Sequence, residues 1–383
     1  MKQVMTHESN SGPLFVVGIW RSGTSLLYAL LNQNPQIALL YEGDLPLLWP
    51  LFKNGKPKLD WVERWDFWNG APRRHNIDVN AIPENVTDMQ SATEAIYKQY
   101  AGLAIWGCKS PNYYDSMTEL AEKFPKARFI VIWRDPRDIV RSIVRAGKKS
   151  SWFRKTGMPL RAILGCRELK KQCDMLTSRG VALHQIQYEE MVKDPGAAMM
   201  RVCRFLGIAF DSKMASLTNA DRSAIYSAEH HAMVKGARID SSREKEEVLS
   251  PALKSKIERY IGFWREEYGG TWPAVPVLDS RSLPTASWLE RGFDRLRYRS
   301  LRAFDQAVLH LYCHAPLGLL RGYRKVKRYR DGTPSGPVKK SVTAAVVKTS
   351  SGSSQDSFPL RTIPAVEMSS TGTSNQPVHR GAL

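Results

Sequence analysis

The segment PLFVVGIWRSGTSLLYALL, residues 13–31, decides the fold of this chain. Four apolar residues, 14–17, end at Gly18, and leucines recur at helical spacing from Leu26 onward. This pattern predicts a buried strand, a short glycine-punctuated loop and a helix. The N–H groups of such a loop, and the N-terminus of the helix that follows it, point toward a bound anion. We therefore expect residues 18–25 to form an anion-binding loop.

The loop has the spacing of a nucleotide-binding P-loop, from Gly18 to Gly23 and then Thr24-Ser25. It departs from that motif at one position, because Thr24 stands where a nucleotide triphosphatase has lysine. The cation of the loop is instead Arg21. Since the missing lysine would clamp the terminal phosphates of a triphosphate, its replacement indicates a different anion.

The composition limits the fold and the class of partner. The 383 residues suffice for one large α/β domain with appendages or for two small domains. The 56 Lys and Arg against 37 Asp and Glu give a net charge of +19, which indicates an anionic partner: nucleotide, nucleic acid, sulfated glycan or membrane surface. Five scattered cysteines without C-x-x-C indicate reduced thiols and no structural zinc. A polar N-terminus and no long apolar run predict neither a signal peptide nor a transmembrane helix, hence a cytoplasmic protein.

Further apolar segments alternate with helical patterns along the chain. Strands are predicted at residues 36–41, 103–108, 128–133 and 181–187, in addition to the first one. Such alternation predicts an α/β fold, with a P-loop-like parallel sheet of about five strands flanked by helices. We assign residues 1–270 to this domain. Residues 271–331 are predicted to be a basic amphipathic helical appendage, and residues 332–383, rich in Ser and Thr, a disordered tail.

The second informative motif is WRDPRDIVRSIVRAG, residues 133–147. A buried strand ends at Arg134, Asp135 is a natural N-cap, and Pro136 suits the first position of a helix that is predicted to end at Gly147. Arg134 then projects from the carboxyl end of a strand, where open α/β sheets bind ligands. Together with Ser142 it can hold one phosphate from two sides.

Two other strand ends carry charged residues. Glu42 follows the second predicted strand and Lys109 the third. A carboxylate in such a place suits the removal of a proton from a hydroxyl. A structural role for Glu42, as an N-cap or in an ion pair, is the alternative. A tryptophan-rich segment, residues 45–70, lies between Glu42 and Lys109 in the sequence. Its tryptophans at positions 61, 65 and 68 share one helical face, which is typical of core packing. A wall that stacks against a substrate is the alternative.

In these motifs the chain resembles the sulfotransferases that use 3′-phosphoadenylyl sulfate (PAPS). Their 5′-phosphosulfate loop is similar to residues 21–25, and their 3′-phosphate motif to residues 134–136 with Ser142. The segment 188–207 resembles their late strand–helix signature, so the resemblance covers about residues 13–270. In active-site layout the chain is most similar to tyrosylprotein and related Golgi or bacterial enzymes. The cytosolic enzymes have a catalytic histidine shortly after the lysine, whereas Lys109 is followed by Ser110-Pro111-Asn112.

The resemblance implies transfer of a sulfuryl group from PAPS to a hydroxyl of a carbohydrate, a lipid, a small molecule or a protein tyrosine, without a metal. It implies Glu42 as the base, with Arg21 and Lys109 as the other catalytic residues. Residues 230–238 look like the family's mobile nucleotide-covering loop, with an incidental basic surface loop as the alternative. The implied donor-binding residues are Arg21, Ser22, Gly23, Thr24, Ser25, Arg134, Ser142, Lys235 and Arg238.

Two other functions fit parts of the sequence. A small-molecule kinase would explain the P-loop spacing, with Asp135 in place of a Walker B aspartate, but the missing lysine disfavours it. A non-enzymatic protein that binds a polyanion or a membrane would explain the net charge and the composition of residues 281–330, which include 12 Arg and Lys but only three acidic residues. The apolar residues of that segment predict packing on the core, with a peripheral membrane contact as the alternative. No nucleic acid is expected.

Overall fold

The computed structural model describes residues 12–55, 58, 60–78, 81–82, 86–102, 104–154, 157–226, 231–237, 239, 249–267 and 284–330. Arg238, the predicted domain boundary near residue 270 and the predicted tail, residues 332–383, lie outside these ranges. The domain division therefore stays a prediction.

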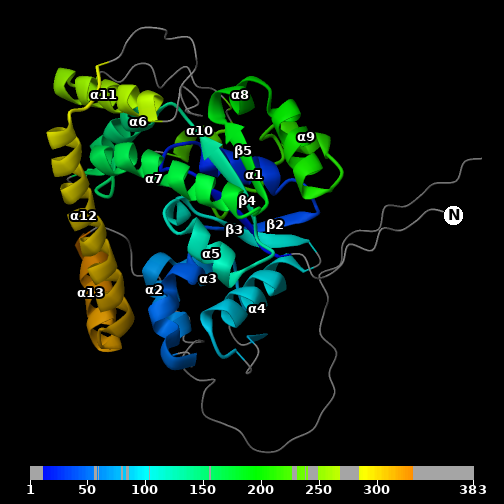
Figure 1. Cartoon of the computed structure of the whole chain (residues 1–383). Coiled ribbons are helices and arrows are strands. Elements are labelled where there is room, and N and C mark those ends of the chain that lie inside the picture. The colour runs from blue at the N-terminus through cyan, green and yellow to red at the C-terminus, as the bar shows by residue number, and fades with distance from the viewer. Residues whose placement is uncertain are drawn as a thin grey trace, which may run out of the picture. The chain divides into compact units, whose positions relative to one another are not determined.

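The centre of the fold is a five-stranded sheet with the order β2-β3-β1-β4-β5, in which every pair of neighbours is parallel (Figure 1). Each strand begins within two residues of its prediction, so the predicted fold class is confirmed. The P-loop strand lies in the middle, and the carboxyl ends of its neighbours therefore surround the loop. The strands are β1 (Leu14–Val17), β2 (Ile37–Tyr41), β3 (Ile105–Lys109), β4 (Arg128–Trp133) and β5 (Leu183–Gln187).

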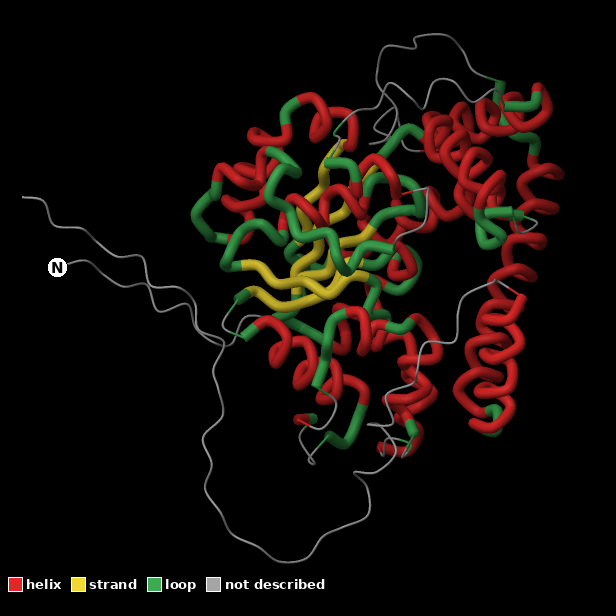
Figure 2. The backbone as a smooth tube through the Cα atoms, turned by 180° about the vertical axis from the view of Figure 1, so that it is seen from behind, coloured by secondary structure: helices red, strands yellow, loops and turns green. Residues whose placement is uncertain are grey.

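Helices cover both faces of the sheet (Figure 2). In β1, Leu14 and Val16 face one layer, and Phe15 and Val17 face the other, which explains why the strand is apolar throughout. The first layer contains α1 (Thr24–Leu31), α8 (Tyr188–Lys193) and α9 (Pro195–Leu206). The second contains α4 (Met89–Ala101), α5 (Met117–Lys123), α6 (Pro136–Lys149) and α7 (Met158–Ser178).

The other helices lie around this sandwich. Among the described residues, no helix is long and apolar enough to cross a membrane. α12 runs beside α7, α2 and η1. These helices are η1 (Leu45–Gly55), α2 (Trp61–Asn69), α3 (Ala71–Arg74), η3 (Pro111–Tyr113), η4 (Ser212–Ala215), α10 (Ala232–Lys235), α11 (Pro251–Glu267), α12 (Trp288–His314) and α13 (Leu317–Arg330).

The structure corrects two local predictions. Helix α6 does not end at Gly147 but continues to Lys149, with Ser150 as its C-cap. Gly147 instead allows a close approach, because a Cβ there would lie 3.3 Å from the carbonyl oxygen of Phe153. Residues 71–88, whose polar sequence predicts a loop, begin instead with the one-turn helix α3, which follows Gly70 in the left-handed conformation (φ 68°).

A third correction concerns α12, which packs on the core with a different face from the one predicted. Leu289, Phe293 and Leu296 are exposed, whereas Asp294 and Cys313 are buried. The helix is held by polar contacts, because its acids pair with bases of the preceding elements.

Candidate active site

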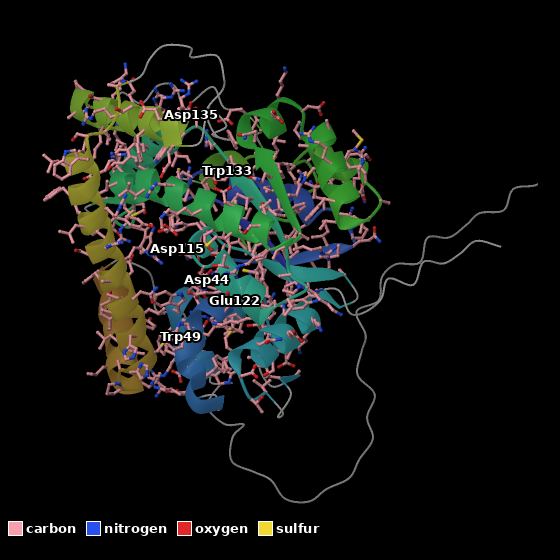
Figure 3. The ribbon with its side chains drawn as sticks, viewed as in Figure 1. Asp44, Trp49, Asp115, Glu122, Trp133 and Asp135 are labelled. Carbon is pink, nitrogen blue, oxygen red and sulfur yellow. The ribbon has the colours of Figure 1, made fainter. Side chains whose placement is uncertain are left out.

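A cavity of about 990 Å³ lies outside the carboxyl edge of the sheet. The loop after β1, the ends of β2 and β4, and the inner side of α12 all contribute to its wall. In Figure 3, Asp44, Trp49 and Asp115, which line the cavity, lie on the side of the sheet that faces α12. This is the edge at which parallel α/β sheets bind ligands, and at which the sequence predicts the site.

The P-loop is shaped by two close approaches. Gly23, the N-cap of α1, has a φ of 101°, and a Cβ there would lie 2.4 Å from Cδ2 of Tyr188. A Cβ on Gly18 would lie 2.5 Å from the hydroxyl of Ser22. That hydroxyl is buried and has no hydrogen-bond partner among the residues that the structure describes. A buried hydroxyl of this kind, at the N-terminus of a helix, fits an oxygen of a bound anion.

The contact between Gly23 and Tyr188 predicts an unusually large effect of a single methyl group. Gly23→Ala should destabilise the protein by about 1–3 kcal/mol more than Gly207→Ala, because overpacking adds to the backbone strain. Gly207 is a matched control: its φ is 70°, but nothing lies within 4 Å of its added Cβ. Urea unfolding measures both free energies, and equal losses would contradict the proposed role of Tyr188.

Three of the predicted donor-binding residues meet beside the loop. Arg21 Nε donates a hydrogen bond to Ser142 Oγ (3.0 Å), and Arg134 Nη1 donates to the carbonyl oxygen of Arg21 (2.9 Å). The Arg134 guanidinium is stacked 3.8 Å above the ring of Tyr188. Burial and the neighbouring charge of Arg134 lower the pKa of Arg21 to about 10, so Arg21 is cationic at neutral pH. Two adjacent guanidinium groups favour the binding of an anion.

The predicted catalytic pair also comes together. Lys109 Nζ donates to Glu42 Oε1 (2.8 Å) and lies 3.5 Å from the centroid of the Tyr41 ring. Lys109 is fully buried, and burial lowers its pKa, whereas Glu42 opposes that shift. The carboxylate of Glu42 lines the cavity, but Lys109 is not part of its wall. Lys109 therefore lies behind Glu42, in a place to orient it.

Helices α2 and α3 hold the turn that carries Glu42. Trp65 Nε1 donates to the carbonyl of Gly43 (2.5 Å), and Asn69 Nδ2 donates to that of Glu42 (2.7 Å). Arg74 Nη2 donates to the carbonyl of Tyr41 (2.8 Å). Glu42 itself has a φ of 49°, a conformation that costs free energy for any residue with a Cβ and persists because its surroundings impose it.

The two interpretations of the tryptophan-rich segment apply to different residues. Trp65 is fully buried and Trp61 nearly so, as core packing requires. Trp49 and Trp68 line the cavity, and Trp68 makes an edge-to-face contact with Tyr312 of α12 (5.4 Å between centroids). One helix thus supports the core and, through Trp68, the wall of the cavity.

His75, just after α3, predicts a pH dependence of stability. Its Nε2 accepts a hydrogen bond from the backbone N–H of Tyr41 (2.9 Å), and burial lowers the pKa of His75 to about 4. Because the unfolded chain binds this proton at about pH 6.5, the stabilising neutral form is lost as the pH falls from 6.5 toward 4.

Between pH 7 and pH 4 the wild type should lose about 3 kcal/mol more than His75→Gln, which can accept the same hydrogen bond without titrating. Urea unfolding at a series of pH values measures the difference, since other groups titrate alike in both proteins. If plots of the unfolding free energy against pH are parallel for the two proteins, His75 is protonated in the folded state at low pH, which would contradict the prediction.

Sequence reasoning missed Asp44 as a site residue. It is almost fully buried, lines the cavity and accepts a hydrogen bond from Asn112 Nδ2 (3.0 Å). Burial and the nearby Glu42 raise the pKa of Asp44. The only signal in the sequence was its position two residues after Glu42. Tyr188, which directly follows β5, gave a similar signal, and its contacts now assign it to the walls of both the loop and the cavity.

The predicted nucleotide-covering segment is described only in part. Lys235 Nζ donates to the carbonyl oxygen of Arg222 (2.7 Å), and its neighbour Val234 lines the cavity. Lys235 is not part of the cavity wall in this structure, so its contact with a phosphate stays a prediction. In the described part of the chain no cluster of His, Cys, Asp and Glu could hold a metal ion. The five cysteines are free and buried.

Comparison with known proteins decides the family. Residues 13–212, more than half of the chain, match the family described as "Sulfotransferase family". The chain belongs to this family. Among curated relatives it is 24% identical over 279 residues to protein-tyrosine sulfotransferase A of Caenorhabditis elegans, covering 69% of this chain, and 23% identical over 262 residues to protein-tyrosine sulfotransferase 1 of Danio rerio, covering 65%. The chain spans 65% of the length of each of these two proteins.

Solved sulfotransferase structures are similar at lower identity. The sulfotransferase domain from the curacin biosynthetic pathway is 19% identical, with a TM-score of 0.49, and the match covers 66% of this chain and 97% of that domain. The corresponding domain of the Synechococcus PCC 7002 olefin synthase is 20% identical, with a TM-score of 0.48 and coverage of 66% and 95%.

Proposed function

We propose that this sulfotransferase moves the sulfuryl group of PAPS to a hydroxyl of a carbohydrate, a lipid, a small molecule or a protein tyrosine. The observation that carries the proposal is the position of the Glu42–Lys109 pair, at the end of β2 and β3, beside a P-loop without lysine. Membership of the family and the cluster of Arg21, Arg134 and Ser142 support it further.

The chemistry assigns a role to each group. The acceptor oxygen attacks sulfur as its proton passes to Glu42, and the bond between sulfur and the 5′-phosphate oxygen breaks, which releases adenosine 3′,5′-bisphosphate. The amides of Gly23 and Thr24, together with Arg21, stabilise the charge that develops on the leaving phosphate. Lys109 acts as a positioning residue, because it holds the Glu42 carboxylate from behind. In this account Arg134 and Ser142 bind the 3′-phosphate.

The contacts of Asp135 disfavour the kinase alternative. That alternative needs an aspartate after β4 that is directed at a metal–nucleotide complex. Asp135 instead caps α6 through the N–H of Arg137 (2.8 Å), and both of its carboxylate oxygens accept hydrogen bonds from the Arg137 guanidinium (2.7 and 3.0 Å). Its charge is thus paired within the helix terminus.

The test is a transfer assay with PAPS that carries radiolabelled sulfur. The acceptors are glycans, hydroxyl lipids, small phenols and tyrosine peptides, each incubated with the full chain. We expect a labelled product in one class and none with Glu42→Gln. Release of label to water alone, or equal labelling by wild type and variant, would contradict the proposal.

A further inference from the structure

The outward side of α12 has the reverse of the usual polarity of a surface helix. Leu289, Phe293, Leu296, Phe304 and Leu311 recur at helical spacing on one face and are each between 63% and 69% exposed. We call these five residues, together with Val308 of α12 and Leu319 of α13, the α12 face. Single exposed apolar side chains are common on proteins, but several of them along one face of a helix mark a binding surface.

The inward side of the same helix carries its acids. Glu290 pairs with Arg259 (2.8 Å), Asp294 with Lys256 (2.6 Å), and Asp305 with Arg161. The three acids among residues 284–330 are therefore neutralised within the protein. The helix thus uses its polar residues for docking and leaves its apolar residues outside.

The charge around the α12 face is positive. Arg297 of α12 lies beside the stripe and Arg299 lies toward its other edge; both are exposed, and neither pairs with a carboxylate among the residues that the structure describes. Arg295 lies on the far side of the helix, where it lines a smaller cavity with residues of α7 and α11. An apolar stripe flanked by arginines suits a lipid surface with anionic head groups, since the stripe enters the acyl boundary while the arginines stay at head-group level. A polyanion would leave the leucines in water, and a second copy would bring two positive surfaces together.

The α12 face continues into the cavity. Phe304 and Val308 belong both to the face and to the cavity wall, and Trp49 and Tyr323 of the same wall are also exposed. A molecule held in a lipid surface beneath α12 could therefore enter the cavity without crossing water. The cavity, at about 990 Å³, is at the upper end of the range for small-molecule sites.

We infer that the α12 face binds the surface of an anionic bilayer, and that the cavity receives from it an amphipathic acceptor with a hydroxyl head and an apolar chain. The second clause rests on the proposed function, whereas the first does not.

Vesicle co-sedimentation of the full chain tests the docking. The chain should bind phosphatidylcholine vesicles that contain about 30% phosphatidylglycerol much more tightly than vesicles of pure phosphatidylcholine. Phe293→Ser with Leu296→Ser should weaken this binding by about tenfold or more. Replacing Arg297 and Arg299 by Gln should weaken it by about fivefold per residue at low salt. Met175→Ser with Met200→Ser, at exposed apolar positions of α7 and α9, is the matched control and should change nothing.

Three results would overturn the docking. The first is equal binding to neutral and anionic vesicles, and the second is unchanged binding by the Phe293 and Leu296 variant. The third is a wild-type dimer in light scattering that this variant converts to a monomer, which would assign the α12 face to a second copy. Binding of adenosine 3′,5′-bisphosphate to the same variants measures the donor site separately, so a failure of docking is distinguishable from a failure of the proposed function.

A series of alkyl glucosides tests the acceptor class. Affinity for the chain loaded with adenosine 3′,5′-bisphosphate, followed by tryptophan fluorescence, should rise about threefold to fourfold per methylene from methyl to octyl glucoside. An affinity that does not depend on chain length, or no binding of octyl glucoside, would overturn this half of the inference.

Discussion

Glu42→Gln should lower kcat for sulfuryl transfer by about 10²- to 10⁴-fold, the usual contribution of a general base. Glutamine can still accept the hydrogen bond that Lys109 Nζ donates to Glu42 Oε1, so the change removes the base while keeping the shape of the turn. That turn is held independently by Trp65, Asn69 and Arg74 through backbone carbonyls, none of which the substitution alters.

The control for this prediction is Glu122→Gln, at a glutamate whose side chain is largely exposed and which pairs with Arg179. It should retain full activity. Binding of adenosine 3′,5′-bisphosphate to Glu42→Gln should stay within about threefold of wild type, because in the proposed function Glu42 contacts the acceptor and not the phosphates. An active Glu42→Gln would leave only the structural interpretation of the ion pair with Lys109.

Arg134→Met should weaken the binding of adenosine 3′,5′-bisphosphate by about 10- to 100-fold, the value of a charge-assisted hydrogen bond to phosphate. Methionine keeps an unbranched side chain over the ring of Tyr188 while removing the charge. Adenosine 5′-monophosphate, which lacks the 3′-phosphate, should bind wild type and variant within about threefold of each other.

The comparison of the two nucleotides separates a direct contact from a structural one. Arg134 also donates to the carbonyl of Arg21, so its loss could disturb the P-loop itself. In that case both nucleotides would lose affinity equally, and Arg134 would be a residue that positions the loop. Arg137→Met is the control, because Arg137 is bound to Asp135 and does not line the cavity.

The sequence predicts the strands and the charged residues at their ends well, since both depend on local patterns. A buried parallel strand needs a continuous apolar run, and Gly18, Glu42, Lys109 and Arg134 stop those runs. Because parallel strands end at the same edge of the sheet, the residues that follow them could be expected to lie close together although they are far apart in the sequence. The predicted start of α6, with Asp135 as N-cap and Pro136 as first residue, was right, whereas its predicted end at Gly147 was wrong. The loop predicted for residues 71–88 was wrong at its start, where α3 follows the left-handed Gly70.

Features that depend on distant packing could not be predicted. The register of β2 and β3 pairs Tyr41 with Lys109. As a result, the ring of Tyr41 covers Lys109, and Lys109 lies behind Glu42. Trp65 and Trp68 share a helical face, yet only Trp68 reaches the cavity, because Tyr312 of α12 lies against it. The reversed polarity of α12 arises from ion pairs with residues more than thirty positions away, such as that between Arg259 and Glu290.

The most direct test of the account is calorimetric titration of the full chain with two nucleotides. Adenosine 3′,5′-bisphosphate should bind tightly in the presence of EDTA, because Arg21, Arg134, Ser142 and the loop amides supply every contact that the proposal needs. ATP with magnesium should bind far more weakly, since Thr24 stands where a triphosphate site has lysine. Tight magnesium-dependent binding of ATP, with weak binding of the bisphosphate, would contradict the proposed function.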